Sequence, residues 1–523
     1  MNTDEKIGQR IGLGFTGTKI SDELKRHVKK YKAANIILFK DNLENAKQAK
    51  KLCVEIRELV EGETGHQPFI ALDQEGGTVT RLPSDMVNVP GAMALAASGD
   101  TENIFLAAKI TAAELKRIGI NLNLAPVLDV NCNPDNPVIG SRSFGVRAEE
   151  VSHFAAAAIR AYSETGLMCC GKHFPGHGDT AIDSHLDLPL VDRSLCELEV
   201  RELLPFRSAI NAGIPAIMTT HILFPQLEPQ KFPATMSARI LKGLLRENMG
   251  FKGLILSDGM EMKAVKDYYS VPKGCVLALA AGVDIVFICH ESADMTKSLE
   301  AIKAAFDDGR FNIEEFDASV KRILEYREKY AGFGLNPPDI NEDTIGSRHN
   351  ENAALTRSTL ALRYPEKPLP PLSRNPLFIG SLAYRSTIAS AKPDSSLSFG
   401  NWFAKKMGGS SMKTPVNPGT ADIENITANL GSCDSIVLGT YNGHLNRGQM
   451  DLALALYKTA EQRKIPFICL ALRNPWDLSL LPEGVKGIAC WEYSEKSFEA
   501  AAAALRGDFI PSGRMPDGRL PQA

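Results

Sequence analysis

Residues 168–185 have the sequence MCCGKHFPGHGDTAIDSH, in which an apolar run passes directly into a polar loop rich in glycine and proline. The run at 168–173 has the length and composition of a buried β-strand. Segments with an apolar period of about 3.6, such as 104–118, 151–165 and 316–330, indicate helices. Seven further candidate strands lie between such segments in the first 330 residues, at 10–15, 35–39, 69–73, 122–130, 216–221, 253–258 and 284–289.

This alternation predicts parallel strands joined by right-handed crossovers. Eight strand–helix units within residues 1–330 predict an α/β fold whose first domain is a (β/α)8 TIM barrel, with an open doubly wound sheet as the alternative. The proline-rich residues 331–375 predict a linker with one helical stretch near 352–362. Residues 376–523 predict a smaller three-layer α/β sandwich domain. Its expected strands lie at 377–380, 435–440, 467–472 and 487–491.

The composition excludes several classes of function. The 523 residues include 59 basic and 62 acidic side chains, so the net charge of −3 provides no field to attract nucleic acid or an anionic membrane. No apolar run approaches the roughly 18 residues of a membrane span. The acidic N-terminal residues and the ten cysteines, none in a CxxC pair, predict a cytoplasmic protein with free thiols. A chain from which an export signal had been removed would look the same.

Polar residues gather where five of the predicted strands end. Because the carboxyl ends of barrel strands face a common pocket, we expect these side chains to form one site. The groups, in chain order, are Asp73, Gln74, Glu75 and Arg81; Asp129, Asn131 and Arg142; Lys172 and His173; Thr219, Thr220 and His221; and Ser257 and Asp258.

The loop from Lys172 to Asp187 carries three histidines and three aspartates, a set that could bind zinc. Their mixed spacing on a glycine- and proline-rich segment favours a mobile flap over a metal site, and loop hydrogen bonds alone are the third interpretation. Asp183 and His185 flank one serine, so in an extended loop both side chains point to the same side. The carboxylate can then hold one imidazole nitrogen while the other exchanges a proton.

Asp258 is a lone carboxylate at the end of an apolar strand. A charge in that position is unfavourable unless it is paired or used in chemistry, so Asp258 is a candidate nucleophile. A structural role as the cap of the following helix is the alternative.

Together these motifs resemble glycoside hydrolase family 3. The resemblance is carried by the runs KHFPGHG at 172–178, DSH at 183–185 and SD at 257–258, and also by DQEGG at 73–77 and RSFG at 142–145. It is strongest for the bacterial β-N-acetylhexosaminidases that release N-acetylglucosamine from peptidoglycan fragments. It covers the barrel well and the second domain more loosely, through residues 507–516.

The resemblance implies a retaining hydrolase that removes terminal, non-reducing β-linked N-acetylglucosamine through a covalent glycosyl-enzyme intermediate. It implies that Asp258 is the nucleophile and that His185, partnered by Asp183, is the acid/base. It further implies a small carbohydrate substrate, a place in peptidoglycan recycling, and neither metal nor cofactor. The positions that match sugar-binding residues of the family are Asp73, Arg81, Arg142, Lys172 and His173.

Two departures from the family pattern leave questions open. Gly259 stands where this branch often has a second aspartate. The second domain supplies an acid/base glutamate in the glucosidases of the family, and the pair of Asp183 and His185 makes that unnecessary here. A β-N-acetylglucosaminide phosphorylase is one alternative, because neutral histidine repels phosphate less than a carboxylate does. A β-glucosidase, or a carbohydrate-binding protein on an inactive barrel, are the others.

Overall fold

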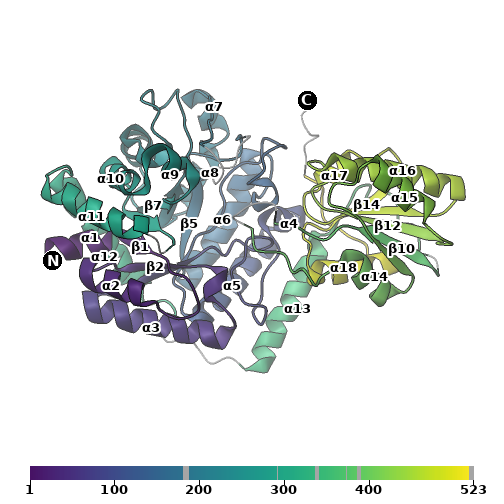
Figure 1. Ribbon diagram of the computed structural model, residues 1–523, viewed down its shortest axis with the longest axis horizontal. Helices are drawn as coiled ribbons and strands as arrows, with labels where there is room; N and C mark the ends of the chain where they lie inside the picture. The colour runs from purple at the N-terminus through teal and green to yellow at the C-terminus, as the bar shows by residue number, and fades with distance from the viewer. Residues whose placement is uncertain (181–187, 291–292, 336–340, 373, 386–389, 517–523) are drawn as a thin grey trace.

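The computed structural model describes residues 1–180, 188–290, 293–335, 341–372, 374–385 and 390–516. Its first part is a closed barrel of eight parallel strands that follow one another in chain order, with β8 pairing back onto β1 (Figure 1). The strands are β1 (Ile11–Leu13), β2 (Asn35–Leu38), β3 (Phe69–Leu72), β4 (Leu122–Asn123), β5 (Met168–Phe174), β6 (Ala216–Thr219), β7 (Leu254–Gly259) and β8 (Ile285–Ile288). The predicted TIM barrel is therefore confirmed, and the open sheet is wrong.

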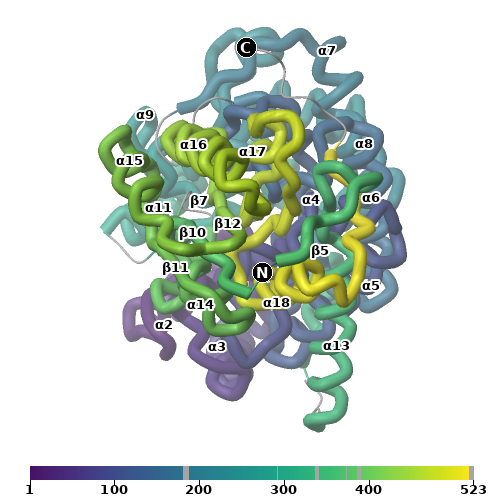
Figure 2. The backbone as a smooth tube through the Cα atoms, turned by 90° about the vertical axis from the view of Figure 1, so that its right-hand side faces the viewer, coloured from purple at the N-terminus to yellow at the C-terminus, as the bar shows by residue number. Residues whose placement is uncertain are grey.

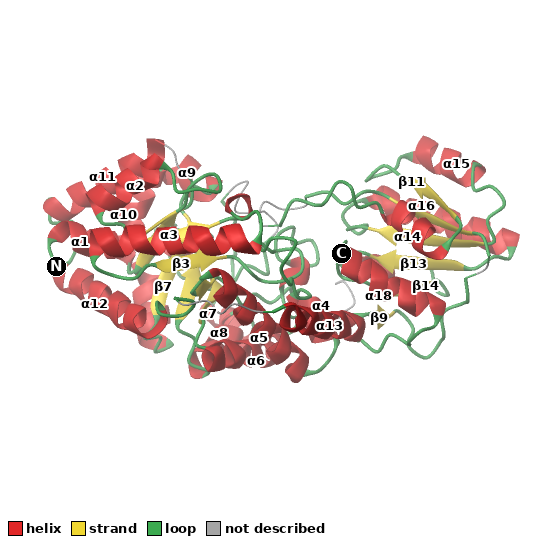
Figure 3. Cartoon of the chain, turned by 90° about the horizontal axis from the view of Figure 1, so that it is seen from below, coloured by secondary structure: helices red, strands yellow, loops and turns green. Residues whose placement is uncertain are grey.

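Helices surround the barrel and return the chain from one strand to the next (Figure 3). Helix α5 shows how the sequence sets their ends, because Asp100 accepts a hydrogen bond from the Glu102 amide at its start and Gly119 ends it with a φ of 87°. The helices are α1 (Thr3–Gln9), α2 (Asp22–Tyr31), α3 (Ala46–Thr64), α4 (Ala92–Ala97), α5 (Thr101–Ile118), α6 (Ala148–Thr165), α7 (Leu195–Val200), α8 (Leu203–Asn211), α9 (Lys263–Tyr269), α10 (Val271–Ala281), α11 (Ala293–Asp307) and α12 (Ile313–Tyr330), with the π-helical η4 (Arg239–Asn248) and the short 3-10 turns η1 (Lys40–Asn42), η2 (Gly140–Arg142) and η3 (Ala234–Met236).

Strand β4 is shorter than the sequence suggests. The apolar run at 122–130 predicts one long strand, but regular pairing ends at Asn123. Pro126 has no N–H to donate to a ladder, and the following residues pair with β5 through an isolated bridge between Val127 and Lys172. The irregular path after β4 thus lies beside the strand that carries Lys172.

The second part of the chain is a sheet with helices on both faces (Figures 1 and 2). Helices α15, α16 and α17 cover one face and α14 and α18 the other, and each face has its own apolar core. The predicted three-layer sandwich is confirmed. The sheet order is β11-β10-β12-β13-β14-β9, with only β9 antiparallel to its neighbour. The elements are β9 (Ala361–Leu362), β10 (Pro376–Gly380), α14 (Phe399–Met407), β11 (Ser410–Lys413), α15 (Thr420–Ala428), β12 (Ser435–Thr440), α16 (Arg447–Arg463), β13 (Phe467–Ala471), α17 (Trp476–Ser479), β14 (Lys486–Ala489) and α18 (Glu495–Arg506).

Helix α13 (Glu342–Thr359) joins the two parts and packs against both. On the barrel side, Arg348 donates to Glu114 of α5 at 2.6 Å and the Asn352 side chain donates to the Asn88 carbonyl at 2.9 Å. The helix expected near 352–362 ends at Thr359, because the chain turns there into β9 and joins the second sheet. The predicted linker therefore contains a helix and a strand, α13 and β9, within its described residues 341–372.

Two further findings concern the chain as a whole. Within the described residues, no helix combines the length and the apolar character needed to cross a membrane. All ten cysteines are free thiols, as predicted, and most are buried. The cytoplasmic location stays a prediction.

Asp284 is a buried anchor at the amino end of the barrel. Its Oδ1 accepts hydrogen bonds from Ser319 Oγ and Arg322 Nη1 of α12, both at 2.6 Å. Its Oδ2 accepts from Arg246 Nη2 at 2.6 Å and from the Ile255 amide at 2.8 Å. One carboxylate therefore ties β7, η4 and α12 to the start of β8.

Replacing Asp284 with alanine removes the counter-charge of Arg246 and Arg322, so we expect the free energy of unfolding to fall by about 3–5 kcal/mol. Urea unfolding followed by circular dichroism measures the change. Asp308→Ala is the control, because Asp308 is 66% exposed and 3.7 Å from Arg310, and its loss should change stability by less than about 0.5 kcal/mol. Equal stability of the two variants would contradict the anchoring role.

Candidate active site

A cavity of about 540 Å³ lies at the carboxyl ends of the barrel strands. It is lined by six of the eight residues to which the family resemblance assigns a catalytic or sugar-binding role, and these come from the ends of β3, β5 and β7 and from the loops that follow β3 and β4. These six are Asp73, Arg81, Arg142, Lys172, His173 and Asp258. The other two, Asp183 and His185, lie outside the described residues, so their predicted roles stay predictions.

A network of buried charges forms one wall of the cavity. Lys172 Nζ lies 2.7 Å from Asp73 Oδ1 and 2.6 Å from Glu75 Oε1. Arg142 makes a two-pronged contact with Glu75, with Nε donating to Oε2 at 2.8 Å and Nη2 to Oε1 at 2.7 Å. Arg81 approaches Asp73 more loosely, at 3.9 Å. Glu75 therefore orients Arg142 and Lys172, the two cations to which the family resemblance assigns a sugar-binding role.

The ion pairs keep these groups charged although they are buried. Burial alone raises the pKa of Glu75, but the charges of Arg142 and Lys172 outweigh it and hold that pKa well below its usual value. Burial lowers the pKa of Lys172, and the two carboxylates beside it more than reverse the effect and raise it. The pKa of Arg142 is raised in the same way by Glu75. At neutral pH the wall therefore presents fixed charges and directional donors to a ligand.

His173 is held by a second buried carboxylate. Asp129 Oδ2 lies 2.6 Å from His173 Nδ1, and its Oδ1 accepts from the His177 amide at 2.7 Å. Burial raises the pKa of Asp129, yet His173 and His177 lower it overall. His177 bonds Thr180 Oγ1 through Nδ1 at 2.8 Å, and burial together with His173 lowers its pKa to about 4, so its ring is neutral. Asp129 thus orients the His173 ring, and Nε2 is the nitrogen that it does not engage.

Asp258 lies near the end of β7, where the pairing with β8 shifts register. Its Oδ1 accepts a hydrogen bond from the Gly259 amide at 2.8 Å. The next helix, α9, has Met262 as its N-cap, so the alternative role of Asp258 as a helix cap is wrong. A Cβ at Gly259 would lie 3.2 Å from Cys289 Sγ. Cys289, which directly follows β8, would therefore have to shift by a few tenths of an ångström to admit a second aspartate at this position.

The loop after His173 is fastened at its base. A Cβ at Gly178 would lie 1.6 Å from the Val130 carbonyl oxygen, so only glycine permits this close approach. Asp179 then pairs with Arg193 Nε at 3.0 Å and Arg201 Nη2 at 2.8 Å. These contacts place the start of the segment that leads to Asp183 and His185.

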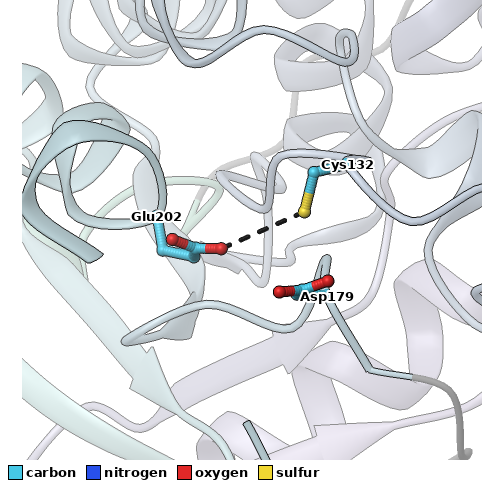
Figure 4. Close-up of side chains that lie close together, drawn as sticks. All are labelled: Cys132, Asp179 and Glu202. Atoms are coloured by element: carbon cyan, nitrogen blue, oxygen red, sulfur yellow. Dashed lines mark hydrogen bonds between the residues drawn. The ribbon is translucent and has the colours of Figure 1, made fainter. Parts of the chain in front are cut away.

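One cluster near this loop has the composition of a metal site. Cys132, Asp179 and Glu202 bring their possible ligand atoms within 4.8 Å of one another (Figure 4), the one such group among the described residues. Arg201 donates to Glu202 Oε1 at 2.6 Å and also pairs with Asp179, while burial raises the pKa of Cys132 to about 12. Guanidinium groups already balance both carboxylates and the thiol is protonated, so the cluster is suited to fasten the loop and not to hold a cation.

Comparison with known proteins identifies the family. The profile of the glycosyl hydrolase family 3 N-terminal domain matches residues 2–326, a range that includes all eight barrel strands. The chain belongs to glycosyl hydrolase family 3. The family and the fold predicted from the sequence are both confirmed.

Relatives within family 3 carry related names. Beta-hexosaminidase A of Pseudoalteromonas piscicida is 32% identical over 367 residues, which are 63% of this chain and 61% of that protein. A beta-hexosaminidase of Nitrosomonas eutropha is 33% identical over 325 residues, 60% of this chain and 91% of the relative. The structure of a family 3 β-N-acetylglucosaminidase from Paenibacillus sp. FPU-7 is 32% identical, covers 99% of this chain and 98% of its own, and has a TM-score of 0.90. These names agree with the predicted enzyme class, and the last of these proteins shares both parts of the architecture.

Two contributors to the site have no role assigned to them by the sequence analysis. Glu75 and Asp129 stand among the polar residues expected at the strand ends, but the sequence does not say what either does. Both are acidic residues that follow an apolar run, and that pattern alone does not distinguish a supporting carboxylate from one that touches substrate. Only the fold places Glu75 between Arg142 and Lys172, and Asp129 against His173.

Replacing Glu75 with glutamine should lower kcat/KM by about a hundredfold, because Arg142 and Lys172 lose the partner that orients them. Stability should fall by about 3 kcal/mol at neutral pH. The pKa of Glu75 is depressed in the folded protein. The stability difference between wild type and variant is therefore fully present above about pH 4.3, and it shrinks as the pH falls towards the folded pKa.

Glu114→Gln is the matched control for this experiment. Glu114 is also buried and pairs with Arg348 at 2.6 Å, but it lies on α5 and does not line the cavity. We expect it to lose stability and keep kcat/KM near the wild-type value. Unchanged activity in Glu75→Gln would show that Glu75 does not orient the sugar-binding cations.

Proposed function

We propose that this protein is a retaining β-N-acetylhexosaminidase that releases terminal, non-reducing β-linked N-acetylglucosamine from glycosides such as peptidoglycan fragments. The observation that carries the proposal is the meeting of Asp258 with the buried cations and His173 in one cavity. The names of the family 3 relatives support the sugar and the bond. This chain spans only 61% of the length of the Pseudoalteromonas relative. The activity of this chain is therefore a proposal.

The shape of the cavity supports removal of an end sugar. Buried apolar residues of the barrel core, Ile37, Leu124, Met218 and Phe287, line the cavity together with the charged wall. A cavity that ends on this core accepts a terminal sugar and does not let a polymer pass through. The leaving group then faces the open side of the cavity.

In the proposed reaction, an Asp258 oxygen attacks the anomeric carbon as the bond from that carbon to the leaving oxygen breaks. His185 gives its proton to the leaving oxygen, and Asp183 stabilises the charged imidazole. In the second step His185 takes a proton from water, which displaces Asp258 from the same carbon. Two inversions give net retention and leave the enzyme unchanged.

The charged wall would hold the sugar while these steps occur. Lys172 and Arg142 offer N–H donors, and Asp73 offers acceptor oxygens, to the hydroxyl groups of the ring. Because ion pairs already fix these side chains, little ordering remains to be done when the sugar binds.

Incubation with a 5-fluoro N-acetylglucosaminide should trap the glycosyl-enzyme, and mass spectrometry of the digest should find the label on Asp258. Asp258→Ala should lower kcat by about a thousandfold or more. Azide added to this variant should restore cleavage and give the α-glycosyl azide, because azide then attacks from the side that Asp258 has vacated. A label elsewhere, or a β-configured azide product, would contradict the assignment.

His185→Ala should slow substrates with poor leaving groups far more than activated aryl glycosides, because only the former need a proton on the leaving oxygen. A series of aryl N-acetylglucosaminides of graded leaving-group pKa measures the slope. An equal loss across the series would contradict the acid/base role. Formation of N-acetylglucosamine 1-phosphate in phosphate buffer would favour the phosphorylase instead, and a preference for glucosides would favour a β-glucosidase.

A further inference from the structure

The second domain forms part of the cavity that contains Asp258. Arg385, Ser390, Ala391 and Lys392 all line it. The Ala391 amide donates to the Thr78 carbonyl of the barrel at 2.9 Å, directly beyond the loop that carries Asp73 and Glu75. Residues 390–392 are therefore held against the barrel on the cavity side.

Three further contacts hold this part of the second domain in place. Inside the domain, Arg473 Nη2 lies 3.1 Å from Ser390 Oγ. Between the domains, Glu492 accepts a hydrogen bond from the Gly91 amide at 2.9 Å, and Asn474 accepts one from the Ser141 amide at 3.1 Å. The second domain is thus positioned to take part in ligand binding as well as in folding.

The outer part of the cavity has a different charge balance from its inner wall. The inner cations Arg81, Arg142 and Lys172 are matched by Asp73 and Glu75. The outer part, which we term the rim, consists of the partly or fully exposed charged residues Lys40, Asp41, Glu261, Lys263, Arg385 and Lys392. It has four cations and two carboxylates, in a protein whose formal net charge is −3.

Two of the rim cations are well suited to meet a ligand. Lys263 and Lys392 are exposed, and no described residue forms an ion pair or a hydrogen bond with either ammonium group in the structure. Lys263 comes from the start of α9, five residues after Asp258, and Lys392 comes from the second domain. The two domains therefore supply one cation each to the same opening.

From this arrangement we infer that the rim is a binding site for a carboxylate on the aglycone, the part of the substrate that leaves. The inference rests on the proposed function, because it takes the sugar to lie against the inner wall and Asp258. The aglycone must then lie in the outer part of the cavity, among the rim cations. A negative charge there is attracted both during encounter and in the bound complex.

Two disaccharides that differ by one carboxylate test this inference. N-acetylglucosaminyl-β-1,4-N-acetylmuramic acid carries a lactyl carboxylate on the aglycone, and N,N′-diacetylchitobiose has the same linkage without it. The measured quantity is the ratio of kcat/KM for the acidic substrate to that for the neutral one. A third substrate, the muramic acid disaccharide with its carboxylate converted to an amide, separates charge from size.

We expect Lys392→Met and Lys263→Met each to lower this ratio by about threefold, and the double variant by about tenfold, as is usual for exposed charges. Lys392→Glu should lower it further. Salt at about 1 M should lower the wild-type ratio as well, because the Debye length is then about 3 Å. The ratio of kcat/KM for the amide substrate to that for the neutral disaccharide should not respond to any of these changes.

Lys413→Met is the matched control, because Lys413 is also an exposed lysine of the second domain but does not line the cavity. It should leave the ratio at the wild-type value. A ratio that stays unchanged in both Lys392→Met and Lys392→Glu would contradict the inference and leave the proposed function standing. If the wild-type enzyme cleaves neither disaccharide, the proposed function is contradicted, and this inference with it.

Discussion

The buried pairing of Glu75 and Asp73 with Arg142 and Lys172 is the interaction on which the candidate site depends. Each of these charges would be strongly unfavourable inside a barrel by itself, and each is stable because an opposite charge lies within hydrogen-bonding distance. The four residues come from two strand ends and one loop, so the pairs also hold those segments in register. The site that we propose for a neutral sugar thus has rigid, charged side chains whose charges largely cancel one another.

The same principle recurs around the site. Asp129 orients His173, and Arg201 joins Asp179 to Glu202 at the base of the loop that leads to the predicted acid/base. At the opposite end of the barrel, Asp284 pairs with Arg246 and Arg322 and so joins η4 and α12 to the start of β8. In each case a charged side chain that does not line the cavity fixes the position of another side chain. Preorganisation of this kind is what permits binding energy to be used in the transition state.

The division of labour between the domains follows from their contacts. The barrel alone holds the inner wall and Asp258, and the family 3 match at residues 2–326 covers that part. The second domain adds Arg385 and Lys392 at the cavity opening, anchored through Ala391. The relative from Nitrosomonas eutropha is matched over 91% of its length by 60% of this chain. In our proposal, the second domain is the part of the chain that adds cations from outside the barrel to the region of the aglycone.

The eight barrel strands and the inner site residues followed from the sequence, because apolar runs and the polar residues at their ends are local patterns. Local patterns did not reveal β11, an exposed edge strand with the polar sequence SSMK, nor the early end of β4 before Pro126. The sequence by itself determined the fold class, the family and Asp258 as the candidate nucleophile. The tertiary structure alone decided the partnership of Glu75 with Lys172 and the approach of Lys392 to the cavity, because contacts between distant segments depend on packing that no local pattern encodes.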